Sequence, residues 1–115
     1  MAQGSRIPYG KLVRDRIPEI IRAGGEIPEI RVLGPDDFVP ALIAKLHEEA
    51  EELGSAGAAE VLGELADLHE VLAALTAALG FTAAEVEAAA ARKRAERGGF
   101  TERLWLESTT RPHHG

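Results

Sequence analysis

Apolar residues recur at helical spacing over two long segments of the chain. Positions three or four residues apart share one face of an α-helix. In the first segment, the apolar line runs through Leu42, Leu46 and Leu53. In the second, the apolar line runs through Val61, Leu65, Leu68, Leu72, Leu75 and Leu79. The pattern predicts two long amphipathic helices joined as an antiparallel hairpin.

Capping and helix-breaking residues set the expected ends of these two helices. Asp36 or Asp37 is expected to cap the first helix, with Pro40 tolerated in its first turn. That helix is expected to end near residue 53, because the small residues 54–57 follow. The second helix is expected over about 59–79, with Gly80 as its C-terminal cap.

Shorter elements are expected on both sides of the hairpin. A short helix should begin at Ile17 or Pro18 and end at the glycines 24–25. The capping-box pattern at residues 82–85 predicts a third long helix that extends to about Arg97. Residues 30–33 and 103–107 are candidates for two short strands that pair. The expected fold class is all-α: a helical hairpin plus a third helix, with a short two-stranded ribbon as a candidate addition.

Two pairs of carboxylates lie on or beside the apolar lines. Glu49 takes a position where the first line calls for leucine, and Glu52 lies at the edge of the same face. Glu64 and Asp67 share one flank of the second line. Carboxylates at an apolar boundary are costly unless cations neutralise them, and Lys45 is the one lysine in the two helices. The pattern indicates a site for a hard divalent cation, with a solvated, charged helical hairpin as the alternative.

Basic residues gather at two other places. Lys11 and Arg14 precede the short helix that is expected to begin at Ile17 or Pro18. Lys93 and Arg97 lie in the last turns of the helix that is expected to end near Arg97. One interpretation is that these residues contact phosphates. The alternatives are a solvated turn at the first place and complementation of a helix C-terminus at the second. Lys93 lies as many residues after Gly80 as Asp67 lies before it, so an antiparallel pair of helices would bring the two level.

Composition narrows the function classes. The 115 residues suit a single domain over 1–115, with loose tails at 1–6 and 108–115 that include the pair His113 and His114. A net charge of -6 argues against binding of a nucleic-acid backbone. There is no cysteine for a disulfide or a thiolate metal site. Because the chain has neither an apolar run of membrane-spanning length nor a signal-peptide pattern, we expect no membrane partner and a cytoplasmic location.

The aliphatic composition also predicts self-association. Hydrophobic residues make up 45% of the chain and aromatic residues 4%, which is typical of a helical bundle. The third long helix is rich in alanine and offers little surface to bury the leucines of its neighbour. A homo-oligomer is therefore expected. Phe100 and Trp105 are candidates for stacking on a nucleotide base, although core packing is the favoured role for both.

Four motifs in order resemble the MazG-like, all-α NTP pyrophosphatases, in particular the phosphoribosyl-ATP pyrophosphohydrolase-like subgroup. They are KLVRDRIPEII at 11–21, EExxE at 48–52, ExxD at 64–67 and KRAERGGF followed by LWL at 93–106. The resemblance spans about residues 7–107. It implies a Mg²⁺-dependent hydrolase, with Mn²⁺ as a substitute, that cleaves a nucleoside triphosphate between the α and β phosphorus. It also implies assembly as a homodimer or homotetramer.

The resemblance assigns roles to particular residues. Glu49, Glu52, Glu64 and Asp67 would be the magnesium ligands, and Glu48 or one of the ligands would accept the proton of the attacking water. Two rival functions remain. One is hydrolysis of phosphoribosyl-ATP in histidine biosynthesis, and the other is a non-enzymatic helical interaction module.

Overall fold

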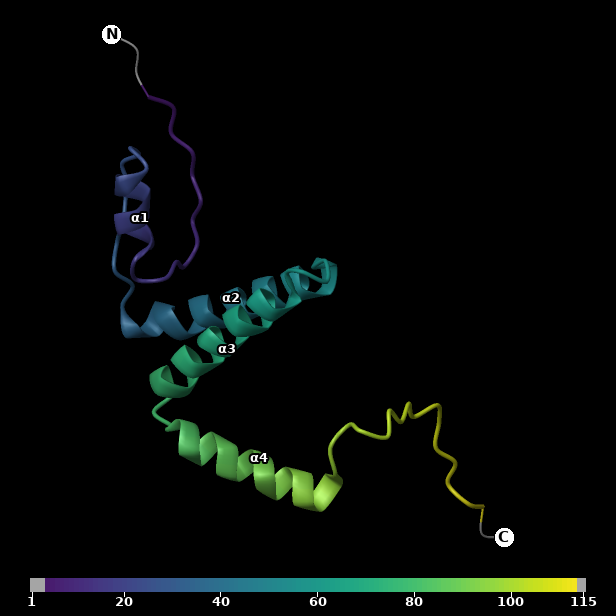
Figure 1. The fold of residues 1–115 in the computed structure, drawn as a ribbon. Coiled ribbons are helices and arrows are strands. Elements are labelled where there is room, and N and C mark those ends of the chain that lie inside the picture. Colours follow the sequence, from purple (N-terminus) through teal and green to yellow (C-terminus); the bar gives the residue numbers. More distant parts are fainter. Residues whose placement is uncertain (1–3, 114–115) are drawn as a thin grey trace. The chain divides into compact units, whose positions relative to one another are not determined.

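Four helices make up the regular structure of the chain. The computed structural model describes residues 4–113, and it contains no strand in that range (Figure 1). The helices are α1 (Ile17–Ala23), α2 (Pro35–Ser55), α3 (Val61–Ala78) and α4 (Ala83–Arg97). The all-α fold class is thereby confirmed. The chain divides into two compact units, the first extending to Ala83 and the second beginning at Ala84.

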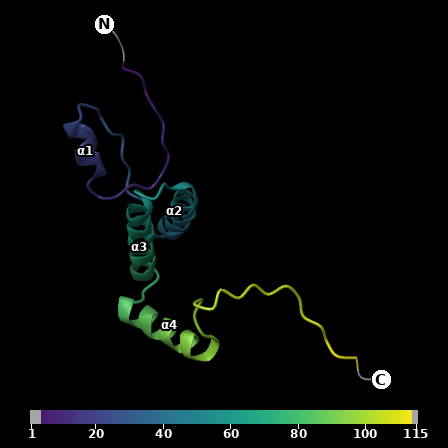
Figure 2. The same ribbon diagram turned by 45° about the vertical axis from the view of Figure 1, so that its right-hand side comes forward.

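Helices α2 and α3 form the centre of the first unit. They lie side by side as an antiparallel hairpin, connected by residues 56–60 (Figures 1 and 2). The core of the hairpin consists of Leu42 from α2 and Val71 and Leu75 from α3. Partly buried side chains that pack around this core are Leu12, Phe38, Val39, Leu46 and Ala74. This small core fixes the two helix faces that carry the acidic residues.

The buried face of α3 differs from the apolar line expected from the sequence. Of the expected line, Leu75 is buried, whereas Leu65, Leu72 and Leu79 remain 49%, 51% and 55% exposed. Val71, which lies outside that line, is buried. Helix α3 has apolar residues on more than one side, and α2 covers a single face of it. That face is the flank that carries Glu64 and Asp67, so these carboxylates face α2 rather than border the contact.

The ends of α2 also differ from expectation. The helix begins at Pro35 with Gly34 as its N-cap, and not at a cap formed by Asp36 or Asp37. These two aspartates lie instead in the first turn, where negative charge complements the helix dipole. Pro40 therefore lies in the second turn and not in the first. The helix continues to Ser55, whose hydroxyl donates to the carbonyls of Glu51 and Glu52 at 3.2 and 3.4 Å.

The helix stops expected at glycines are confirmed for α1 and α3. Gly25 and Gly80 have φ values of 89° and 86°, in the left-handed region that glycine adopts without strain. After α3, the amides of Gly80 and Phe81 donate to the carbonyls of Ala77 and Thr76 at 3.0 and 2.9 Å. This is the Schellman pattern, which satisfies carbonyls left free at the helix end.

The expected ribbon of strands 30–33 and 103–107 is wrong, because neither segment is a strand. Arg103 has φ 57°, and its amide donates to the carbonyl of Phe100 at 3.1 Å. The left-handed residue and the turn interrupt the extended backbone that pairing requires. The polar and apolar alternation of residues 103–107 therefore does not lead to a sheet.

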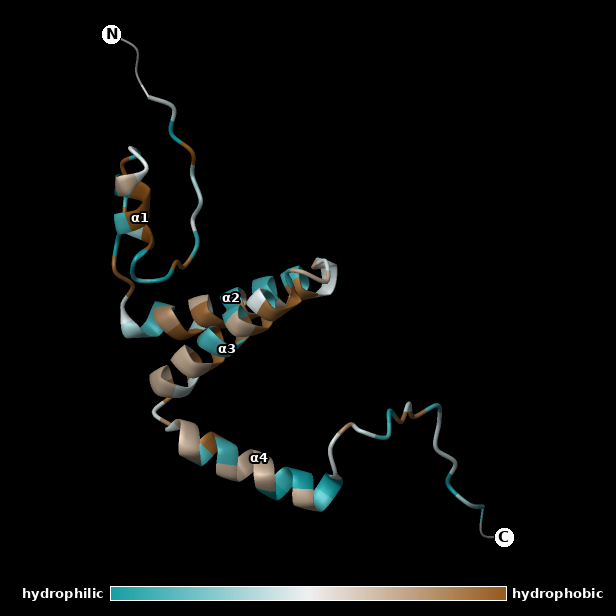
Figure 3. Cartoon of the chain, in the orientation of Figure 1, coloured by the Kyte–Doolittle hydropathy of each residue, from teal (hydrophilic) through white to brown (hydrophobic). Residues whose placement is uncertain are grey.

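The second unit consists of most of α4 and the segment that follows it. Helix α4 has no buried residue, and its last turns are the more hydrophilic part of the helix (Figure 3). The expectation that Phe100 and Trp105 pack into a core is wrong, because they are 97% and 84% exposed. Residues 4–6 and 108–113 have no helix or strand, while 1–3 and 114–115, including His114, lie outside the described residues.

No single helix among residues 4–113 has the length and apolar composition to cross a membrane. Helices α3 and α4 reach that length and composition only when they are counted together.

Candidate metal centre

Helices α2 and α3 bring three carboxylates together beside the hydrophobic core. Glu49 lies on the face of α2 that carries Leu42, and it is the one charged side chain buried among residues 4–113, at 6% exposed. Glu64 and Asp67 lie on the facing side of α3 and are half-buried. One carboxylate oxygen from each of the three residues lies within 4.8 Å of the other two. The structure brings together three of the four carboxylates that the sequence predicted for one site. Glu64 and Asp67 lie deeper in the contact between α2 and α3 than predicted.

Two oxygens of this acidic trio lack hydrogen-bond partners. Glu49 Oε2 and Glu64 Oε2 are both buried and accept no hydrogen bond. A buried polar atom without a partner loses its hydration without compensation. Carboxylate oxygens are the ligands that Mg²⁺, Mn²⁺ and Ca²⁺ prefer. The donor set therefore fits a hard divalent cation.

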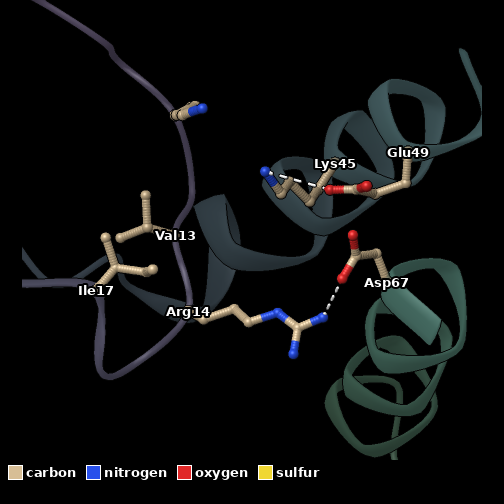
Figure 4. Close-up of a pocket in the computed structure, with 7 residues that line it drawn as sticks. Val13, Arg14, Ile17, Lys45, Glu49 and Asp67 are labelled. Carbon is tan, nitrogen blue, oxygen red and sulfur yellow. Dashed lines mark hydrogen bonds and ion pairs between the residues drawn. The ribbon is translucent and has the colours of Figure 1, made fainter. Parts of the chain in front are cut away.

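Two basic side chains neutralise part of the cluster (Figure 4). Lys45 Nζ lies 3.5 Å from Glu49 Oε1 and 3.4 Å from Glu48 Oε2. Arg14 donates from its guanidinium to Asp67 Oδ1 at 2.6 Å. Lys45 pairs with Glu49 and Arg14 pairs with Asp67, and the Oε2 atoms of Glu49 and Glu64 remain without a hydrogen-bond partner.

The surroundings of Glu49 favour its protonated form. Burial is the largest cause and raises the pKa of Glu49 above its ordinary value of 4.5. The adjacent Glu52 carboxylate raises this pKa further, and the charge of Asp67 acts in the same direction. Lys45 opposes them by stabilising the ionised form. Any further positive charge placed beside Glu49 would therefore stabilise its ionised form.

A pocket of about 240 Å³ opens beside the trio. Its lining combines cations, carboxylates and apolar side chains: Lys11, Val13, Arg14, Ile17, Lys45, Glu49 and Asp67 (Figure 4). The segment before α1 supplies one wall, and the contact of Leu12 with the core holds that segment in place. The pocket thus offers carboxylates for a cation and three basic groups for an anion.

The sequence-predicted site residues fall into three groups. Glu49, Glu64 and Asp67 form the trio, and Lys11 and Arg14 line the same pocket. Glu52 is exposed and lies outside the trio, although it is near enough to affect Glu49, and Glu48 is a half-buried partner of Lys45. Lys93 and Arg97 belong to the second unit, and their contact with the site stays a prediction.

Sequence reasoning missed Lys45 as a lining residue of the pocket. The sequence pattern marks this residue only as the one lysine in the two helices. Its position four residues before Glu49 places both side chains on one face of α2, and this spacing was a usable signal. Val13 and Ile17 were also missed, because an apolar wall of a polar pocket has no spacing pattern of its own.

Comparison with known proteins shows a similarity over part of the chain. An uncharacterised protein of Mycolicibacterium smegmatis (strain ATCC 700084 / mc(2)155) is 59% identical over 46 residues, which cover 40% of this chain. The match covers 47% of that protein, so the chain spans about half of the length of the relative. No family model and no solved structure matches the chain.

Proposed function

We propose that this chain is a divalent-cation-dependent nucleoside triphosphate pyrophosphohydrolase of the MazG-like kind. It would cleave between the α and β phosphorus and release a nucleoside monophosphate and pyrophosphate. One observation supports this most strongly: buried Glu49, with an unpartnered oxygen, lies in a trio of carboxylates beside a pocket with three basic groups. In a triphosphate with its bound cation, the cation matches the carboxylates and the phosphates match the three basic groups.

The proposed cation ligands are Glu49, Glu64 and Asp67, with Glu52 joining them from the next turn of α2. Mg²⁺ is the proposed ion and Mn²⁺ its substitute, because both accept carboxylate oxygens. A bound divalent cation would neutralise charge on the phosphate oxygens and lower the pKa of a bound water. It would also relieve the repulsion among the three carboxylates, which Lys45 and Arg14 relieve only in part.

The remaining pocket residues would bind and orient the substrate. Lys11 and Arg14 are the proposed phosphate contacts, because both line the pocket and carry charges that do not depend on the metal. Lys93 and Arg97 are proposed to add further contacts from α4. In phosphoryl transfer, catalysis comes mainly from positioning and charge stabilisation. Glu48 and Glu52 flank Glu49 along α2 and are the candidates to accept the proton of the attacking water.

A substrate panel with product analysis tests this proposal. The purified chain is incubated with Mg²⁺ and each of the common and noncanonical nucleoside triphosphates, and with phosphoribosyl-ATP. We expect pyrophosphate and the monophosphate, in equal amounts, and no reaction with excess EDTA. Release of orthophosphate and a diphosphate would contradict the cleavage position.

The same panel separates the rival functions. Turnover confined to phosphoribosyl-ATP would favour a role in histidine biosynthesis, and the expected cytoplasmic location suits either reaction. The exposed leucines of α3 provide the observation in favour of an interaction module. If no substrate is hydrolysed at any Mg²⁺ or Mn²⁺ concentration, that module becomes the better account.

A further inference from the structure

We propose that Arg14 is an exchangeable counter-cation of the metal centre. In the structure Arg14 pairs with Asp67, and when a divalent cation binds Asp67 the guanidinium transfers to a phosphate of the ligand. The inference rests on the proposed function in one respect, namely that the acidic trio binds a divalent cation. It adds that cation binding and phosphate binding are coupled through one side chain.

The contact between Arg14 and Asp67 places this guanidinium in competition with a cation. The two groups form a charge-assisted hydrogen bond of 2.6 Å, and Asp67 is a member of the trio. Their side chains are 56% and 40% exposed, so water solvates both groups. Exposed ion pairs contribute little net stability, because solvent screens them. The pair is therefore easily exchanged for a stronger interaction.

The backbone around Arg14 is held, so the exchange needs only a side-chain movement. Leu12 packs on the core, and Val13 and Ile17 line the pocket. The amide of Ile17 donates to the carbonyl of Arg14 at 3.0 Å. In Figure 4 the arginine side chain extends across the pocket toward Asp67. The guanidinium can thus leave Asp67 and remain within the same pocket.

Charge balance determines where the displaced guanidinium goes. Once Asp67 binds a cation, Arg14 loses its partner in a pocket that also contains Lys11 and Lys45. Lys45 retains Glu48, at 3.4 Å, as its own partner. A phosphate in the pocket would restore a partner to Arg14. Because coupling between two ligands is reciprocal, the cation would then favour phosphate binding and phosphate would favour the cation.

Calorimetry with two titrants separates this exchange from a purely structural role. Mn²⁺ alone and a preformed complex of Mn²⁺ with inorganic tripolyphosphate are each titrated into the full chain and its variants. Arg14→Gln should bind Mn²⁺ alone about threefold or more tightly, since the competitor is gone, and should bind the complex about threefold or more weakly. Arg14→Lys retains the charge and should behave more like the unmodified chain with both titrants.

Arg16→Gln is the matched control. It removes the same charge two positions away, where Arg16 pairs with Glu19 at 3.2 Å and does not line the pocket. If Arg14→Gln matches Arg16→Gln with both titrants, or binds Mn²⁺ alone more weakly, the exchange is refuted while the metal site stands. If the unmodified chain binds neither titrant, the proposed function fails as well. Circular dichroism of each variant verifies that its helices are intact.

Discussion

At the scale of single residues, the site depends on the burial of Glu49. Its carboxylate is almost inaccessible to water, has one oxygen without a partner, and lies within 4.8 Å of carboxylate oxygens from two further acids. Such an arrangement reduces stability unless a cation is bound. The chain therefore gives up stability in the ion-free form at the place where the proposed cation would bind.

Substitution of Glu49 by glutamine should stabilise the ion-free protein at neutral pH. The folded state holds the proton of Glu49 more tightly than the unfolded state, whose pKa is about 4.5. Stability is therefore lost as the pH rises from 4.5 through the higher folded-state pKa. We expect Glu49→Gln to gain on the order of 1 kcal/mol at pH 7 in EDTA, with the gain shrinking toward pH 4.5.

Urea denaturation between pH 4.5 and pH 7 measures this effect. Glu51→Gln, at an exposed position of the same helix, is the control and should change little. A Glu49→Gln variant that is less stable than the unmodified chain at pH 7 would show that the carboxylate is well compensated, contrary to the structure.

The residue-scale predictions from sequence succeeded where one helix face decided the outcome. The burial of Glu49 followed from its place in the line of Leu42, Leu46 and Leu53. The pairing of Arg14 with Asp67 joins positions 53 residues apart, and helical spacing carries no information about such a contact. The sequence predicted both residues as parts of the site but not their contact.

At the scale of elements, periodicity predicted the helices better than their faces. The hairpin, its short connection and the stops at Gly25 and Gly80 agree with the pattern. The face of α3 was wrong in part. Leu75 of the predicted apolar line is buried, but Leu65, Leu72 and Leu79 of that line are exposed, and Val71, which lies outside the line, is buried instead. The strands were wrong because short apolar segments do not define a pairing partner, which only the tertiary structure supplies.

Helix α4 carries the prediction that separates a functional from a structural role of its basic end. If Lys93 and Arg97 contact the triphosphate, Lys93→Ala and Arg97→Ala should each lower kcat/KM about tenfold or more, as loss of a charge-assisted hydrogen bond does. The melting temperature should hardly change, because charge at an exposed helix end contributes little. Arg94→Ala removes a neighbouring charge and is the control. Unchanged kinetics in both variants would leave only the helix-end role.

At the scale of the whole molecule, little apolar surface is buried. Leu42, Val71 and Leu75 are the buried apolar residues among those described, whereas Leu62, Leu65, Leu72 and Leu79 of α3 are exposed. Exposed leucines spaced along one helix are typical of a surface that another helix covers. The sequence predicted a homo-oligomer for a related reason, namely that the alanine-rich helix α4 offers little surface to bury the leucines of α3. The exposed leucines motivate the same prediction.

Light scattering on a size-exclusion column should therefore give a dimer or tetramer at micromolar concentration. Leu72→Glu should shift the chain toward the monomer, because a charge would be buried without a partner in the interface. Ala77→Glu changes an exposed position of the same helix and should retain the assembly. A monomer for the unmodified chain, or an unchanged mass for Leu72→Glu, would contradict this prediction.

The rate of pyrophosphate release with Mg²⁺ tests the proposed role of the acidic trio most directly. The comparison is between the unmodified chain and Asp67→Asn, with Glu51→Gln as a control outside the site. Since loss of an outer-sphere partner of a metal already costs up to about 100-fold, loss of a ligand should cost about 100-fold or more. A folded Asp67→Asn variant that retains full activity, or activity that persists in excess EDTA, would contradict the assignment of the trio as the metal centre.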